Sequence, residues 1–159
     1  MSNRARLTPA MLALACAAML VACNSDDNNA PNPETYTAAL SGANETTPPA
    51  LIIGATGQST MTVSGNTIAW SLTTANFAAG TTAPGSASTT LPAHIHIGAE
   101  GVAGGIEVPL TATVNGTTSG TVTVVDSVIT HLRAGDSYVN VHTAARPSGE
   151  IRGQLVRVQ

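Results

Sequence analysis

The stretch Pro92-Ala93-His94-Ile95-His96-Ile97-Gly98 carries the pattern that decides the fold. Successive side chains of a β-strand point to opposite faces, so His94 and His96 share one face and Ile95 and Ile97 share the other. The stretch is therefore predicted to be a strand with two imidazoles side by side on its polar face.

A second stretch, Val139-Asn140-Val141-His142-Thr143, repeats this plan, and it too is followed by a glycine-containing turn and another strand. When His142 is aligned with His96, Asn140 takes the position of His94. The chain is interpreted as containing two similar hairpins, and their polar faces are expected to meet.

The composition indicates an all-β protein. The chain has 159 residues, which fits a single domain once any targeting segment is removed. It is rich in Thr, Ala, Gly and Val, and only 9% of its residues are charged and 3% aromatic. Such a sequence predicts many short strands and turns, as in an antiparallel β-sandwich or barrel of the immunoglobulin or superoxide dismutase type.

The charge pattern argues against a nucleic-acid partner. The chain contains no lysine, and its formal net charge is −3 at pH 7. Binding to phosphates requires clustered basic residues. Beyond the first few residues the only basic side chains besides histidine are four dispersed arginines, Arg133, Arg146, Arg152 and Arg157.

Residues 1–22 have the features of an export signal. Arg4 and Arg6 precede an uncharged apolar run from Met11 to Ala22, which is too short for a transmembrane helix. The run ends in Leu20-Val21-Ala22-Cys23, which resembles the lipobox of bacterial lipoproteins, where the cysteine is lipidated and becomes the first mature residue. A plain signal peptide cleaved nearby, or a chance cysteine, is the alternative.

A lipidated Cys23 would attach the protein to a membrane of the cell envelope. The following residue is not Asp, which by the lipobox resemblance favours the outer membrane. Residues 23–35 have no apolar periodicity and are interpreted as a disordered tether. The folded domain is then expected to span residues 36–158, and with a single remaining cysteine it would form no internal disulfide.

Alternation predicts the strands of this domain. Thr35 to Ser41 is a first strand, and the segments Gln58 to Val63 and Thr67 to Thr73 form a hairpin about Ser64-Gly65-Asn66. Asp126 to Leu132 is predicted to form a short helical turn. The face expected to point inward includes Ile106, Val108, Leu110, Val139, Val141 and Leu155, and the outward face includes Asn140, His142, Glu150, Arg152 and Gln154.

Several of these motifs together resemble the CHRD domain, first named from chordin. They are Tyr36-Thr37-Ala38-Ala39-Leu40-Ser41-Gly42 with Asn44-Glu45, Ala93-His94-Ile95-His96-Ile97-Gly98, Gly135-Asp136-Ser137-Tyr138-Val139-Asn140-Val141-His142-Thr143, and Gly149-Glu150-Ile151-Arg152-Gly153-Gln154. The resemblance extends over 36–158. It implies an extracytoplasmic all-β module without established enzymatic activity, and hence a binding or interaction module whose protein or ligand partner is unknown.

The histidines offer a second hypothesis. A His-x-His pair on one strand and His142 on another provide three neutral imidazoles, which suit zinc or copper and leave a coordination position open. Glu150 is expected near His142, either as a ligand or as the group that orients an imidazole. The metal site would therefore comprise His94, His96 and His142.

The alternative to a metal site is a purely structural role. In that interpretation the three histidines form a hydrogen-bonded network with Asn140, Glu150 and Arg152 that holds the two hairpins together. Catalytic templates are missing, since there is no Gly-x-Ser-x-Gly elbow and no free thiol after export. The chain is therefore not expected to be an enzyme.

Overall fold

A computed structural model describes residues 32–46 and 54–159 of the chain. The expected export signal, Cys23 and most of the expected tether lie outside these residues. Strand β1 begins at Glu34, two residues before the expected domain boundary. Within the described residues, no helix is long and apolar enough to cross a membrane.

The structure is built from nine strands, one α-helix and one 3-10 helix in the described residues. In chain order they are β1 (Glu34–Ser41), η1 (Gly42–Asn44), β2 (Thr56–Ser64), β3 (Thr67–Ala75), β4 (Thr90–Ile97), β5 (Gly105–Thr113), β6 (Thr117–Thr123), α1 (Asp126–Ala134), β7 (Ser137–Val141), β8 (Ile151–Gln154) and β9 (Val156–Arg157).

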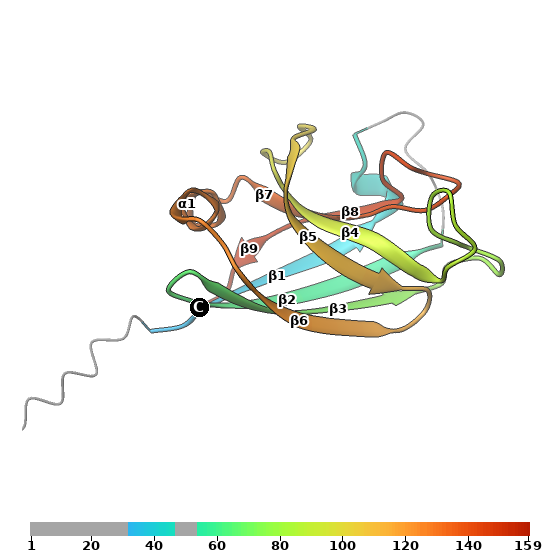
Figure 1. Cartoon of the computed structure of the whole chain (residues 1–159). Helices are drawn as coiled ribbons and strands as arrows, with labels where there is room; N and C mark the ends of the chain where they lie inside the picture. Colours follow the sequence, from blue (N-terminus) through green and yellow to red (C-terminus); the bar gives the residue numbers. More distant parts are fainter. Residues whose placement is uncertain (1–31, 47–53) are drawn as a thin grey trace, which may run out of the picture.

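The strands form a single antiparallel sheet in the order β5-β4-β7-β8-β1-β2-β3-β6, and β9 also pairs with β1. The two end strands contact each other, and Thr118 of β6 donates a hydrogen bond to the Thr111 carbonyl of β5. The sheet is therefore a nearly closed barrel, with α1 lying beside one end of it (Figure 1). The predicted all-β class is confirmed.

Alternation along β2 and β3 provides one wall of the apolar core. Met61, Val63, Ile68 and Leu72 are buried as predicted. Helix α1 buries Val128, Ile129 and Leu132 at helical spacing, and it is longer than the single turn predicted. It ends at Gly135, whose φ of 77° is the left-handed conformation that favours glycine at a helix end.

The prediction for Ile106 is wrong. Its side chain is 57% exposed, although Val108 and Leu110 of the same strand are buried. Strand β4 pairs Ile95 with Val108 but His96 with Ile106, so β5 carries one extra residue at this point. A β-bulge of this kind shifts the alternation of the side chains, which turns Ile106 away from the core.

The two hairpins meet edge to edge, and this is how their polar faces come together. Strand β4 pairs with β7, so His94 lies opposite Asn140, and β7 pairs with β8, so Asn140 lies opposite Arg152. Cross-strand neighbours project from the same face of a sheet. The polar residues of both hairpins therefore form one continuous face.

This polar face lies opposite the core residues Val139, Val141 and Ile151, as predicted, but a loop covers it. Asn140, His142 and Arg152 are all less than 9% exposed. The loop between β4 and β5 lies over them, because the Arg152 guanidinium donates hydrogen bonds to the carbonyls of Ala99 and Val102 at 2.9 Å. Arg152 therefore holds the two hairpins together.

Candidate metal centre

Three histidines converge on the covered polar face. His94 and His96 project from β4, and His142 directly follows β7, where its backbone N–H donates to the Pro92 carbonyl. One ring nitrogen of each histidine lies within 4.8 Å of those of the other two. The pairing of β4 with β7 thus brings together the three residues that the sequence singled out as metal ligands.

Backbone carbonyls orient two of these rings. His96 Nδ1 lies 3.1 Å from the Gly104 carbonyl oxygen, and His142 Nδ1 lies 3.1 Å from that of Pro147. A carbonyl only accepts, so each Nδ1 carries the proton and each Nε2 carries a free lone pair. Both Nε2 atoms are buried and have no hydrogen-bond partner among the described residues. Metal-binding histidines are commonly held in this way.

The surroundings keep the imidazoles neutral. Burial lowers the pKa of all three rings, and for His94 burial together with the neighbouring His142 and His96 lowers the pKa to about 4. Arg152 adds to the lowering at His96. Only a neutral imidazole can donate a lone pair to a metal, so the three rings are in the binding form at pH 7.

Tyr138 and Arg152 fix the position of His96. The Tyr138 ring stacks on the His96 ring at 4.9 Å between centroids, and Arg152 Cζ lies 3.4 Å from the Tyr138 centroid. The Tyr138 hydroxyl also accepts a hydrogen bond from the N–H of Gly104, whose carbonyl in turn holds His96 Nδ1. These contacts restrain the imidazole before any ligand arrives.

Glu150 does not take the place expected for it. Its carboxylate accepts a hydrogen bond from the Thr143 hydroxyl. The Nδ1 atoms that it was expected to orient are held by backbone carbonyls instead. His131 lies on α1, where Nδ1 is 3.0 Å from an Asp136 carboxylate oxygen, and it does not belong to the cluster.

Glu45 is a residue of this face that reasoning from the sequence missed. It directly follows η1, and its Oε1 atom is buried without a hydrogen-bond partner among the described residues. Burial raises the pKa of its carboxyl to about 7, although Arg152 and Asn140 act in the opposite direction. In the sequence Glu45 stood out only as part of the Asn44-Glu45 motif of the CHRD resemblance, and no pattern predicted that this motif lies near the histidines.

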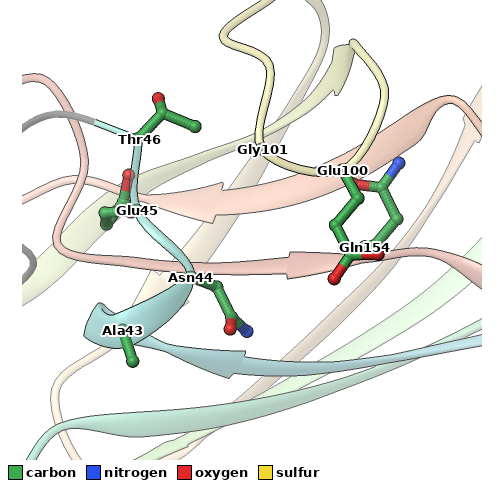
Figure 2. A pocket seen from close by; sticks show the side chains of 7 residues that line it. All are labelled: Ala43, Asn44, Glu45, Thr46, Glu100, Gly101 and Gln154. Atoms are coloured by element: carbon green, nitrogen blue, oxygen red, sulfur yellow. The ribbon is translucent and has the colours of Figure 1, made fainter.

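Glu45 also borders a shallow polar pocket. Figure 2 shows it on the segment that follows η1, whereas Glu100 belongs to the loop between β4 and β5. The pocket is lined by Ala43, Asn44, Glu45, Thr46, Glu100, Gly101 and Gln154. Glu45 is thus positioned between the solvent-facing pocket and the covered face that holds Asn140.

The family model of the CHRD domain matches residues 36–155. The protein belongs to the CHRD family. The match covers most of the chain and includes the three histidines, Glu45, Asn140 and Arg152. No curated protein and no solved structure matches the chain. Membership of the CHRD family supports the general role of a binding or interaction module.

Proposed function

We propose that this CHRD protein is a non-enzymatic metal-binding module of the bacterial cell envelope. Its ligand is a copper or zinc ion held by His94, His96 and His142. Cys23 carries the lipid that anchors it, preferentially at the outer membrane, and the folded domain is presented on the tether that follows. The protein binds no nucleic acid.

One observation carries the proposal. Three neutral imidazoles present ring nitrogens within 4.8 Å of one another, and the Nε2 atoms of two of them are buried without a partner in the described structure. Leaving a buried polar atom unpaired costs about 1 to 3 kcal/mol. A ligand that accepts lone pairs would remove this cost at several atoms at once. Metal–nitrogen bonds of about 2 Å place ligand nitrogens about 3 to 4 Å apart, so the three rings would close in on a shared ion from separations of up to 4.8 Å.

The test is the metal content of the purified protein and its titration with zinc and copper. The control is the triple variant His94→Ala, His96→Ala, His142→Ala. We expect one equivalent of tightly bound metal in the unaltered protein and none in the variant. Equal binding by the two proteins would place the metal elsewhere and contradict the proposal.

The competing function is a protein-interaction module in which the histidines only stabilise the fold. It is favoured by the hydrogen bonds of His96 and His142 to backbone carbonyls and by the stacking on Tyr138. In that case the triple variant would unfold or lose stability in the absence of metal. Under the metal proposal the metal-free variant loses only a little stability, because removing the unpaired Nε2 atoms offsets part of the loss of the hydrogen bonds to Gly104 and Pro147.

A further inference from the structure

We propose that Glu45 is an outer-sphere carboxylate of the metal centre, outside the three convergent imidazoles, and makes the centre selective for divalent ions over copper(I). This inference rests on the proposed metal-binding function and adds a residue to it. The carboxylate compensates the second positive charge of the ion, from the side of the cluster where Asn140 lies.

The unpaired buried polar atoms gather on one face. Seven buried side-chain polar atoms have no hydrogen-bond partner in the described residues. Five of them belong to the polar face covered by the β4–β5 loop or to its border, namely His94 Nδ1, His96 Nε2, His142 Nε2, Asn140 Oδ1 and Glu45 Oε1. Folded proteins pair nearly all buried polar atoms, so the gathering of unpaired atoms on one face indicates a binding site for a polar ligand.

Asn140 neighbours both Glu45 and His94 on this face. It lies directly opposite His94 in the pairing of β4 with β7. Gly149 sits against both Asn140 and Glu45, because a Cβ placed on it would lie 2.5 Å from Asn140 Nδ2 and 2.8 Å from Glu45 Oε1. A glycine here lets the two side chains approach each other closely. Glu45 thus continues the polar face beyond Asn140.

Charge balance also favours Glu45. Three neutral imidazoles contribute no negative charge, and the buried guanidinium of Arg152 adds a positive one close to His96. Glu150 is engaged by the Thr143 hydroxyl. A divalent ion in this setting is stabilised by a nearby anion, since Coulomb interactions are strong where water is excluded. Glu45 has the carboxylate whose Oε1 is buried and unengaged among the described residues.

The charge of the ion determines how much it depends on Glu45. Copper(I) carries one charge and is satisfied by a few neutral nitrogen ligands, whereas zinc(II) carries two and gains more from a carboxylate. Burial raises the pKa of Glu45 to about 7, so the carboxyl ionises near neutral pH and an arriving cation would favour the ionised form.

The experiment compares zinc(II) and copper(I) affinities of the full mature chain, purified in detergent, by competition with chelators of known affinity. Glu45→Gln is isosteric and removes the charge. We expect it to weaken zinc binding by about 10- to 100-fold, the usual effect of losing an outer-sphere partner, and to leave copper(I) binding unchanged. Glu45→Asp, which keeps the charge, should retain most of the zinc affinity.

Glu100→Gln is the matched control, because Glu100 lines the same pocket but lies on the other side of it, on the β4–β5 loop. It should leave both affinities unaltered. Glu45→Ala is a second neutral variant in case the amide introduced by Glu45→Gln disturbs the fold. Unchanged zinc affinity in both neutral variants, or equal losses for zinc and copper(I), would overturn the role of Glu45 while leaving the histidine site intact. No metal binding by the unaltered chain would overturn both proposals.

Discussion

Two carboxylates near opposite ends of strand β1, those of Glu34 and Glu45, have contrasting surroundings. Glu34, at the start of the strand, accepts hydrogen bonds from the Tyr36 hydroxyl at 2.7 Å and from Arg133 Nε at 2.8 Å, and Arg157 lies 3.5 Å away. Arg133 and Tyr36 lower its pKa. Glu45, beyond the other end, has a buried oxygen without a partner among the described residues, and its pKa is raised.

This difference in hydrogen bonding distinguishes polar residues that stabilise the fold from polar residues that are available to bind a ligand. Around Glu34 the chain supplies its own partners, so the cluster is complete and stabilises the fold without any addition. Around Glu45, Asn140 and the three histidines, the described part of the chain leaves lone pairs unused in a buried place. The Glu34 cluster is therefore expected to matter for stability, and the histidine cluster for binding.

The largest expected effect is the loss of metal affinity in His96→Ala. A structural zinc site contributes about 10 to 16 kcal/mol over four ligands, about 3 kcal/mol for each, so loss of one ligand should weaken zinc binding about 100-fold or more. Glu34→Gln, at the other end of β1, should bind zinc normally. Zinc competition titrations of both variants would check this. Equal zinc affinities would contradict the claim that the histidine cluster binds the metal and the Glu34 cluster does not.

Gly149→Ala should have the next largest effect, on stability. Gly149 has a φ of 135°, and an added Cβ would lie within 2.8 Å of both Asn140 and Glu45. We expect a loss of about 2 to 3 kcal/mol in the free energy of unfolding. Gly101→Ala is the control, because its φ of 75° is also positive but no atom would lie within 4 Å of the new Cβ, and it should cost about 1 kcal/mol. Urea unfolding curves would measure both, and similar losses would contradict crowding at Gly149.

The two clusters should lose stability in different ranges of pH in the metal-free protein. The pKa values of all three histidines are lowered from 6.5, so below that pH the unfolded chain binds protons that the native cluster does not, and the free energy of unfolding falls as the pH falls. For His94 this decline extends to about pH 4. Glu45 has the opposite effect on stability. Its pKa is raised from 4.5 to about 7, so between these values the native carboxyl binds a proton that the unfolded chain does not. The Glu34 pKa is lowered from 4.5, so its contribution is lost at more acidic pH.

Unfolding measured from about pH 8 to about pH 3 would resolve the two ranges. The triple histidine variant should lose the decline that begins near pH 6.5, and Glu34→Gln should lose only the decline below about pH 4.5. A histidine variant that kept the first decline would show that other groups produce it.

The smallest expected effect distinguishes two buried tyrosines. Tyr36 donates to Glu34, and Tyr138 accepts from the N–H of Gly104. Replacing either by Phe should cost about 1 kcal/mol of stability. Only Tyr138→Phe should also weaken zinc binding, by less than any ligand substitution, because Gly104 holds His96 Nδ1. Thermal melts with zinc titrations would show whether the effect on binding is confined to Tyr138.

Local patterns allowed much of the fold to be predicted. The alternation in Gln58 to Val63 placed Met61 and Val63 in the core correctly, and the spacing of Val128, Ile129 and Leu132 located the helix. The prediction failed at Ile106, because a bulge depends on the pairing of β5 with β4 and leaves no mark in the alternation of β5 alone.

By itself the sequence determined the strands, the CHRD motifs and the three histidines as one candidate set, because alternation and motif spacing are local properties of the chain. Only the tertiary structure placed β4 beside β7, covered the polar face with the β4–β5 loop and brought Glu45 to Asn140. These arrangements depend on the register between strands far apart in the sequence and on which polar atoms the folded chain leaves unpaired. Neither is a property of any single segment.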